Sequence, residues 1–250
     1  MKKFRADLHI HTVLSPCADL EMTPANIINA AKRSQLDIIG ITDHNSTRNA
    51  QLVKNMAQNE GIFVLTGVEV TTKEEVHCLA FFEKKTELAE FQKFLEEQIT
   101  FIPNTNNYFG YQPVIDENEN ILEMIPNYLP AALKAGVREV QDEVKRHNGI
   151  FIAAHVDRSA NGIFSQLGFI PDNLEFDALG ISRYSSKNDV RKHYVVKEKI
   201  SLLRNSDAHF LHHIGDCFSL FYINKPDFSE IKMALNQEYN RFVEIDEDHC

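Results

Sequence analysis

The 250-residue sequence contains no tryptophan, few cysteines and no apolar run long enough to cross a membrane. Its four cysteines, Cys17, Cys78, Cys217 and Cys250, form no Cys-x-x-Cys pair, which argues against a cysteine-rich zinc site and suits a reducing compartment. No apolar stretch of the kind found in secretory signals follows Met1. We therefore expect a cytoplasmic protein that is not embedded in a membrane.

Positive charge is also scarce in this sequence. Lys and Arg number 26 against 36 Asp and Glu, so the formal net charge is −10. General affinity for nucleic acid comes mainly from Lys and Arg that neutralise phosphates, so this composition disfavours a long nucleic-acid track. It still allows one phosphorylated ligand to be held by locally concentrated cations. The signatures GxGxxG, GxxxxGK[ST], GxSxG and HExxH are absent, so no competing catalytic motif is found.

The sequence does have a repeated alternation of apolar, strand-like runs with helical stretches. This alternation predicts an α/β fold with a parallel sheet, and 43% hydrophobic residues are enough to build its core. We expect one domain over residues 1–250, interrupted by an insertion at about 84–135. Within that insertion a hairpin would turn at Asp116–Asn120, and a helix is predicted over 128–147.

The first strand-like run, RADLHIHT, carries Asp7, His9 and His11 at alternate positions. Alternate side chains of a strand share a face, so these three would point one way and Leu8 and Ile10 the other. Two interpretations remain open at this point. Either a polar face meets water, or three potential ligands are aimed at one place.

Five further apolar runs contain, or end in, a histidine or a carboxylate: GITDHN, TGVEVT, EVHCLA, IAAHVDR and RNSDAH. Burying such groups without partners is costly, and in α/β barrels the carboxyl ends of the strands converge on one face. Imidazole and carboxylate ligands suit Zn, Mn and Fe. A cluster of two or three such cations needs a bridging carboxylate, and Glu69 is the natural candidate.

The motifs DLHIHT, ITDHN, GVEV, HV and SDAH, in this order between Asp7 and His209, resemble those of the PHP (polymerase and histidinol phosphatase) superfamily of metal-dependent phosphoesterases. The resemblance implies a distorted seven-stranded β/α barrel, here with an inserted segment. It also implies two to three divalent ions, Zn, Mn or Fe, at the carboxyl ends of the strands, and hydrolysis of phosphate esters by a metal-activated water.

The resemblance leaves the substrate open. The first interpretation is a phosphomonoesterase acting on a small phosphorylated metabolite or nucleotide, with no obligate protein partner. The alternatives are an exonuclease-like phosphodiesterase acting on the ends of a short oligonucleotide, or a non-catalytic sensor of a metal or phosphate ligand. A metal-dependent amidohydrolase is less compatible, because no lysine sits at these strand ends.

The same resemblance assigns the ligands. One ion would be bound by His9 and His11 with Glu69 and Asp207, a second by Glu69, His77 and His155, and a third by His44 and His209. Glu69, Asp207 and His209 would also be catalytic. Asp7 and Asp43 precede ligand histidines and would orient them, because metal-bound histidines usually donate their other ring N–H to a carboxylate or carbonyl.

One loop departs from the family pattern. Where related sequences supply a His or Asp to the third ion, this chain reads SPCAD, and Pro16 has no side chain that binds metal. Cys17 or Asp19 would take that place, and a Cys17 thiolate would favour Zn or Fe over Mn. The other interpretation is that the third site lacks a protein ligand here.

Two arginines and three aromatic residues are further candidates for substrate contact. Arg158 and Arg183 follow strand-like runs, and a guanidinium fits phosphate bidentately, so both are expected to bind substrate. Tyr108, Phe109 and Tyr111 lie in the insertion. They would either stack a base or anchor their loop to the core.

Overall fold

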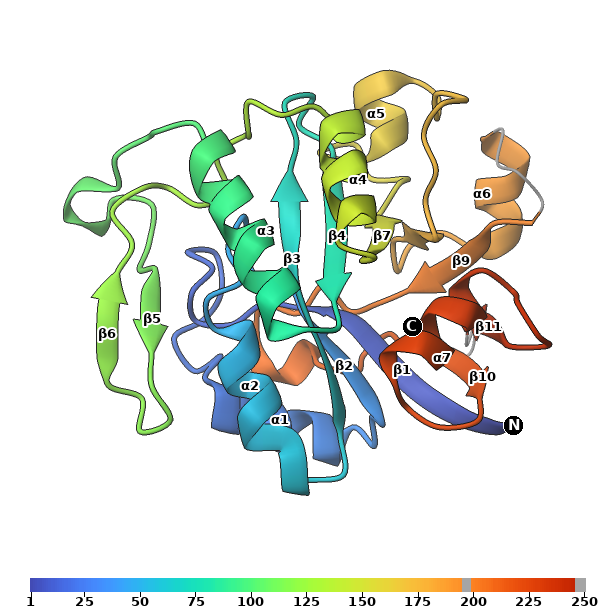
Figure 1. The fold of residues 1–250 in the computed structure, drawn as a ribbon, viewed down its shortest axis with the longest axis horizontal. Helices are drawn as coiled ribbons and strands as arrows, with labels where there is room; N and C mark the ends of the chain where they lie inside the picture. Colours follow the sequence, from blue (N-terminus) through green and yellow to red (C-terminus); the bar gives the residue numbers. More distant parts are fainter. Residues whose placement is uncertain (195–198, 246–250) are drawn as a thin grey trace.

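The computed structural model of the chain describes residues 1–194 and 199–245 (Figure 1). Nine strands form one sheet in the order β11-β10-β1-β2-β3-β4-β7-β8-β9. The two outer strands, β9 and β11, contact each other, so the sheet is a nearly closed barrel. The strands of this sheet are β1 (Lys2–Ile10), β2 (Ile38–Ile41), β3 (Phe63–Thr71), β4 (His77–Phe82), β7 (Ile150–Ala153), β8 (Ala178–Ile181), β9 (Ser201–Arg204), β10 (Ser219–Ile223) and β11 (Phe242–Ile245).

The predicted α/β barrel class is confirmed, but the sheet has nine strands rather than seven and is not wholly parallel. Strand β4 runs antiparallel to both β3 and β7, and β10 runs antiparallel to both β1 and β11. The start of β4 therefore lies beside the end of β3, with His77 paired to Thr71. This reversal brings a residue from the beginning of a strand to the barrel end where its neighbours finish.

Seven α-helices are described in this structure, and several cover the outside of the sheet (Figure 1). Their bounds are α1 Pro24–Arg33, α2 Ala50–Met56, α3 Lys85–Gln98, α4 Val137–Arg146, α5 Ile163–Leu167, α6 Lys187–His193 and α7 Phe228–Leu235; three short 3-10 turns lie at Ala57–Asn59, Thr105–Asn107 and Leu211–His213. In α3, Leu88, Phe91 and Leu95 are spaced three and four apart and are all buried, as expected of a helix with one apolar face.

The inside of the barrel is filled by apolar side chains from strands that are distant in the sheet order. Leu8 of β1, Phe81 of β4 and Leu203 of β9 belong to one buried cluster, which ends against Phe228 and Ile231 of α7. Ile10 belongs to a different cluster with α1 and α2. Leu8 and Ile10 therefore do not share one face of β1 as expected from alternating side chains, because the pairing of β1 with β2 is irregular between Asp7 and Ile10.

The first part of the insertion predicted at about 84–135 forms the regular helix α3, and residues 99–136 interrupt the succession of strands and helices. They contain the hairpin of β5 (Pro113–Ile115) and β6 (Ile121–Met124), which turns at Asp116–Asn120 as predicted. The helix predicted over 128–147 is only partly right, because it begins at Val137. The carbonyls of Leu129 and Ala131 instead accept hydrogen bonds from the side chain of Asn45, so this part of the chain is held in an irregular conformation.

Two findings concern the cysteines and the apolar character of the chain. Among the described helices, none has the length and apolar character of a membrane span. Cys17 and Cys78 are free thiols. The compartment expected from the sequence stays a prediction.

Candidate metal centre

The ionisable residues singled out in the sequence meet at one end of the barrel. His9 lies in β1 and His11 just beyond it, His44 follows β2, His155 follows β7, and Asp207 and His209 follow β9. His44 also pairs with Glu69 of β3 through an isolated bridge, and His77 is the first residue of β4. Residues separated by up to 200 positions in sequence are thus neighbours in the fold.

Glu69 lies at the middle of this group and is only 1% exposed. Its Oε1 is 2.9 Å from His77 Nδ1 and 3.2 Å from the Nε2 atoms of His9 and His155. Its Oε2 is 3.2 Å from His44 Nδ1 and 3.4 Å from His11 Nε2. One buried carboxylate therefore faces five imidazoles, three on one oxygen and two on the other.

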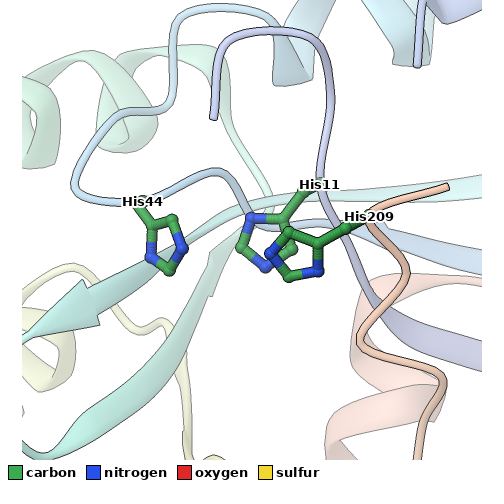
Figure 2. Close-up of side chains that lie close together, drawn as sticks. All are labelled: His11, His44 and His209. Atoms are coloured by element: carbon green, nitrogen blue, oxygen red, sulfur yellow. The ribbon is translucent and has the colours of Figure 1, made fainter. Parts of the chain in front are cut away.

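Within the described residues, three groups of donor atoms are close enough together to hold a cation each. The first is His9, His11, Glu69 and Asp207, the second is His44, Glu69 and His77, and the third is His11, His44 and His209. Figure 2 shows the third group, with the His11 and His209 rings close together and His44 facing them across a gap. His155 approaches Glu69 but is in none of these groups.

The donor atoms are spaced as ligands of one ion would be. In the first group, neighbouring donors are 3.2–3.4 Å apart, including 3.2 Å between the Nε2 atoms of His9 and His11. Ligands bound tetrahedrally at about 2.0–2.1 Å lie roughly 3.3 Å from one another. Nδ1 of His44 is buried and makes no well-aligned hydrogen bond to the described residues, although Glu69 Oε2 lies 3.2 Å away. These residues fit a group of divalent cations.

The protonation of the cluster follows from burial and mutual charge. Burial alone would raise the pKa of Glu69, but the charges of His77, His9 and His44 hold it well below its usual range. Burial would lower the pKa of His11, yet its hydrogen bonds to Asp207 and Glu69 raise it to about 10. Burial and the charge of His11 lower the pKa of His209 to about 4. At neutral pH, Glu69 is thus ionised and His209 is neutral, whereas His11 carries a proton that a bound cation must displace.

Asp43 reaches a ligand histidine through a serine. The Ser15 hydroxyl donates to Asp43 Oδ1 at 2.7 Å and lies 2.9 Å from His11 Nδ1. The serine oxygen therefore accepts the Nδ1–H of His11, which leaves Nε2 facing the centre. Asp43 also accepts hydrogen bonds from the Thr12 N–H and hydroxyl, both at 2.7 Å. Asp43 is thus connected through Ser15 to His11, rather than to His44, the histidine that it precedes in sequence.

Asp7 acts on backbone rather than on an imidazole. Its carboxylate accepts hydrogen bonds from the backbone N–H groups of Ser206, Gly215 and His9, at 3.0, 3.1 and 3.4 Å. Complete burial raises the pKa of Asp7 to about 6, against the opposing effect of these bonds. Asp7 therefore fixes the segment that carries Asp207, rather than the ring of a ligand histidine.

Both arginines predicted to bind substrate lie beside the centre. Nη1 of Arg158 donates to Asp207 Oδ2 at 2.6 Å, while Asp207 Oδ1 faces His9 and His11. Arg183 pairs with Asp216 at 3.0 Å. The two arginines line a narrow pocket of about 40 Å³ together with His9 and Asp207. Their position agrees with substrate contact, which remains a prediction.

Comparison with known families identifies the arrangement. The model of the family described as PHP domain matches residues 7–166, which is more than half of the chain. The chain belongs to the PHP domain family. The matched range ends before Asp207 and His209, and the barrel brings these two residues to the others. The fold class and the set of donor residues thus both agree with membership of the PHP domain family.

Three similar proteins extend the comparison. The uncharacterized protein YqxK of Bacillus subtilis is 23% identical over 274 residues, covering 97% of this chain and 64% of that protein. The crystal structure of the lesion-specific endonuclease PfuEndoQ of Pyrococcus furiosus superposes with a TM-score of 0.79 at 20% identity, covering 97% of this chain and 58% of that one. A two-domain protein of Bacteroides vulgatus containing a predicted PHP-like metal-dependent phosphoesterase gives 0.58 at 15% identity, over 97% and 65%. The chain spans less than two-thirds of each.

In this PHP domain, the SPCAD loop departs from the family pattern. Its two candidate ligands, Cys17 and Asp19, lie outside the donor groups found among the described residues. Cys17 is a free thiol. Although the residue as a whole is exposed, desolvation of its sulfur together with the charge of Glu69 raises the pKa of the thiol to about 12. Asp19 Oδ1 accepts the backbone N–H of Glu21 at 2.8 Å. Asp19 lies next to His209, because its backbone N–H donates to the His209 carbonyl at 2.9 Å. Neither Cys17 nor Asp19 belongs to a donor group, so ligation by either stays a prediction.

Three positioning residues of this PHP domain were not found from the sequence. Ser15 connects Asp43 to His11, Asn45 ties the loop after β2 to residues 129–131, and Asp157 accepts the N–H and hydroxyl of Ser182 at 2.7 and 2.6 Å. Only Asn45 could have been suspected from the sequence, because it directly follows the TDH motif. In the structure its φ is +42°, a conformation that asparagine tolerates. Ser15 and Asp157 carry no such mark.

Proposed function

We propose that this chain hydrolyses phosphate esters with the help of two to three bound divalent cations, Zn, Mn or Fe. The observation that carries the proposal is the convergence of three adjoining donor groups around the single carboxylate of Glu69. When bound, the cations supply an activated water and neutralise the charge on the phosphate oxygens.

The protein groups hold and orient this machinery. His9, His11, Glu69 and Asp207 would hold one cation, Glu69 and His77 a second, and His44 and His209 a third, because one imidazole nitrogen binds only one ion. Glu69 belongs to the first two groups, so it would serve both of these cations. His155 adds an imidazole 3.2 Å from Glu69 Oε1. Cys17 and Asp19 remain candidates to complete the third position.

Arg158 is proposed to bind the phosphate of the substrate. Its guanidinium lies against Asp207 and is 46% exposed, so it can turn from this carboxylate to an incoming phosphate. Arg183, 34% exposed on the same pocket, is the second candidate. Either arginine would place a positive charge beside the phosphate, in a chain whose net charge is −10.

A small phosphorylated metabolite or nucleotide is the simplest substrate for this centre. A second candidate is a phosphodiester of nucleic acid, and the fold similarity to a lesion-specific endonuclease favours it. A net charge of −10 argues for contact with a few nucleotides rather than a long track. A non-catalytic sensor would use the same ligands without turnover.

The test is a substrate panel assayed with metal-loaded protein. Phosphate release from p-nitrophenyl phosphate, hydrolysis of bis(p-nitrophenyl) phosphate and cleavage of a labelled oligonucleotide are compared for the wild type and Glu69→Gln. We expect turnover of at least one ester by the wild type and at least a 100-fold loss in the variant. Metal-loaded wild type that turns over none of them would sink the enzymatic proposal in favour of a sensor.

A further inference from the structure

Residues 99–136 carry a group of aromatic side chains that the metal centre does not use. Phe101, Tyr108, Phe109 and Tyr111 are 72%, 83%, 39% and 50% exposed. The Tyr108 and Phe109 rings meet edge to face at 5.0 Å, and Phe109 packs on Tyr128 at 4.4 Å. We call Tyr108, Phe109 and Tyr111 the aromatic cluster. Phe109 thus anchors the loop, whereas the ring of Tyr108 is left almost wholly open.

The loop that carries the aromatic cluster is held by its own polar side chains. Asn104 accepts the N–H of Phe109 at 2.9 Å and donates to the carbonyl of Gly110 at 2.8 Å. Gln112 donates to the carbonyls of Ile125 and Asn127, and accepts the N–H of Leu129 at 2.8 Å. A side chain presented from such a braced loop loses little freedom when it binds a ligand.

The aromatic cluster adjoins the metal centre. Gly110 has a φ of +104°, and a Cβ at this position would overlap the carbonyl oxygen of Pro16, so the two loops are in close contact. Asn49 donates to both Thr12, the residue after His11, and the carbonyl of Pro113 at the start of β5. The base of the hairpin and the ligand loop of β1 are therefore fastened to the same side chain.

The charge of the neighbourhood limits what the aromatic cluster can bind. The adjoining hairpin carries Asp116, Glu117, Glu119 and Glu123, and Arg48 nearby is paired with Glu123 at 2.9 Å. A strand of phosphates is repelled here. The flat, uncharged face of a base is not, and aromatic side chains stack on bases of any sequence.

We infer that the aromatic cluster stacks on a nucleobase that is splayed out from a nucleic-acid strand whose phosphate lies at the metal centre. This inference rests on the proposed function and narrows its substrate class. Tyr108 supplies the open stacking face, while Phe109 and Tyr128 support it from behind. The contact selects a substrate that carries a base over one that carries only a phosphate ester.

Fluorescence provides a direct test, because the chain has no tryptophan of its own. Tyr108→Trp, loaded with metal, is mixed with a thymidine octanucleotide or with a baseless deoxyribose-phosphate oligomer of equal length. We expect immediate quenching by the first oligomer only. The matched control is Tyr239→Trp, since Tyr239 is 75% exposed in the loop between α7 and β11, on the other side of the molecule from the hairpin (Figure 1).

Kinetics provide a second readout. In Tyr108→Ala, the ratio of kcat/KM for the octanucleotide to kcat/KM for bis(p-nitrophenyl) phosphate is expected to fall about 5- to 100-fold, and Tyr239→Ala should keep the wild-type ratio. An unchanged ratio, or equal quenching by both oligomers, would overturn the inference. So would a wild type that cleaves the small ester but neither cleaves nor binds the octanucleotide, and in that case the phosphoesterase proposal stands. If the metal-loaded wild type hydrolyses none of the esters, both the phosphoesterase proposal and the inference about base stacking are wrong.

Discussion

Among the single residues of the centre, His11 has a proton whose release on metal binding can be measured. In the metal-free protein, hydrogen bonds to Asp207 and Glu69 raise the pKa of His11 to about 10 in spite of its burial. Nε2 of His11 also lies 3.2 Å from Nε2 of His9. A cation in the first donor group must displace that proton.

We therefore predict that metal binding releases about one proton per chain at pH 8, and that this release disappears as the pH rises through 10. The raised pKa also means that His11 stabilises the metal-free fold fully below its unfolded value of 6.5, and that this contribution is lost on the way to pH 10. Calorimetric titration of metal in buffers of different ionisation enthalpy measures the release. Equal heats in all buffers at pH 8 would contradict it.

Ser15 gives a second prediction at this scale. In Ser15→Ala the Nδ1–H of His11 loses its acceptor, and Asp43 loses its connection to the ring. Such orienting contacts are worth about 10- to 100-fold in metal affinity. We expect a loss of this size in competition titrations with a chelator dye. Ser229→Ala, which removes an exposed hydroxyl on α7, is the control, and the same affinity in both variants would refute the role of Ser15.

At the scale of elements, loops rather than strands decide how the centre is enclosed. Asn45, which is 2% exposed, accepts the N–H of Thr71 and donates to the carbonyls of Leu129 and Ala131, at 3.0, 2.8 and 2.8 Å. It therefore joins the loop after β2, the end of β3 and the segment before α4. All three partners are buried backbone groups.

Asn45→Ala should lower the free energy of unfolding by about 2–4 kcal/mol, because buried backbone groups lose their partners and alanine tolerates the positive φ less well. Urea denaturation measures the loss, and limited proteolysis should show faster cleavage within 99–136. Asn55→Ala, at an exposed position of α2, should change stability by less than about 0.5 kcal/mol. Equal stability of the two variants would show that Asn45 does not hold the insertion.

The sequence predicted the donors of the centre better than the elements that present them. His9, His11, His44, Glu69, Asp207 and His209, which lie in motifs resembling those of the family, all fall in donor groups. His77 also falls in a donor group although it lies outside these motifs, whereas His155 of the HV motif falls in none. The reversed direction of β4 was not predicted, since a run such as EVHCLAFF has the same pattern in either direction. Ser15 escaped notice for a similar reason: its contacts depend on how a loop closes.

At the scale of the whole molecule, closure of the barrel is what completes the centre. Contact between β9 and β11 and the pairing of β10 with β1 bring Asp207 and His209 to His9 and His11. Ligands from both halves of the chain would then be joined by the same cations. Bound metal should consequently stabilise the complete barrel rather than one loop.

Removal of metal by a chelator should therefore lower the Tm of the protein. Metal at 100 times its Kd contributes about 2.7 kcal/mol, which corresponds to roughly 5–10 °C for a chain of this size. Differential scanning calorimetry before and after chelation, followed by return of Mn or Zn, measures the shift. We expect one cooperative unfolding transition, whose Tm falls on chelation and rises again when metal is returned. A Tm that stays the same after chelation and after return of metal would contradict the prediction.

Hydrolysis of phosphate esters by cations held around Glu69 requires that activity follow the metal content of the protein. Metal-free protein is titrated with Mn or Zn, bound metal is counted by mass spectrometry of the eluted protein, and turnover of the best ester is followed in the same samples. We predict no turnover without metal, and a rise that levels off at two to three ions per chain. Full activity in protein shown to hold no metal would contradict the account.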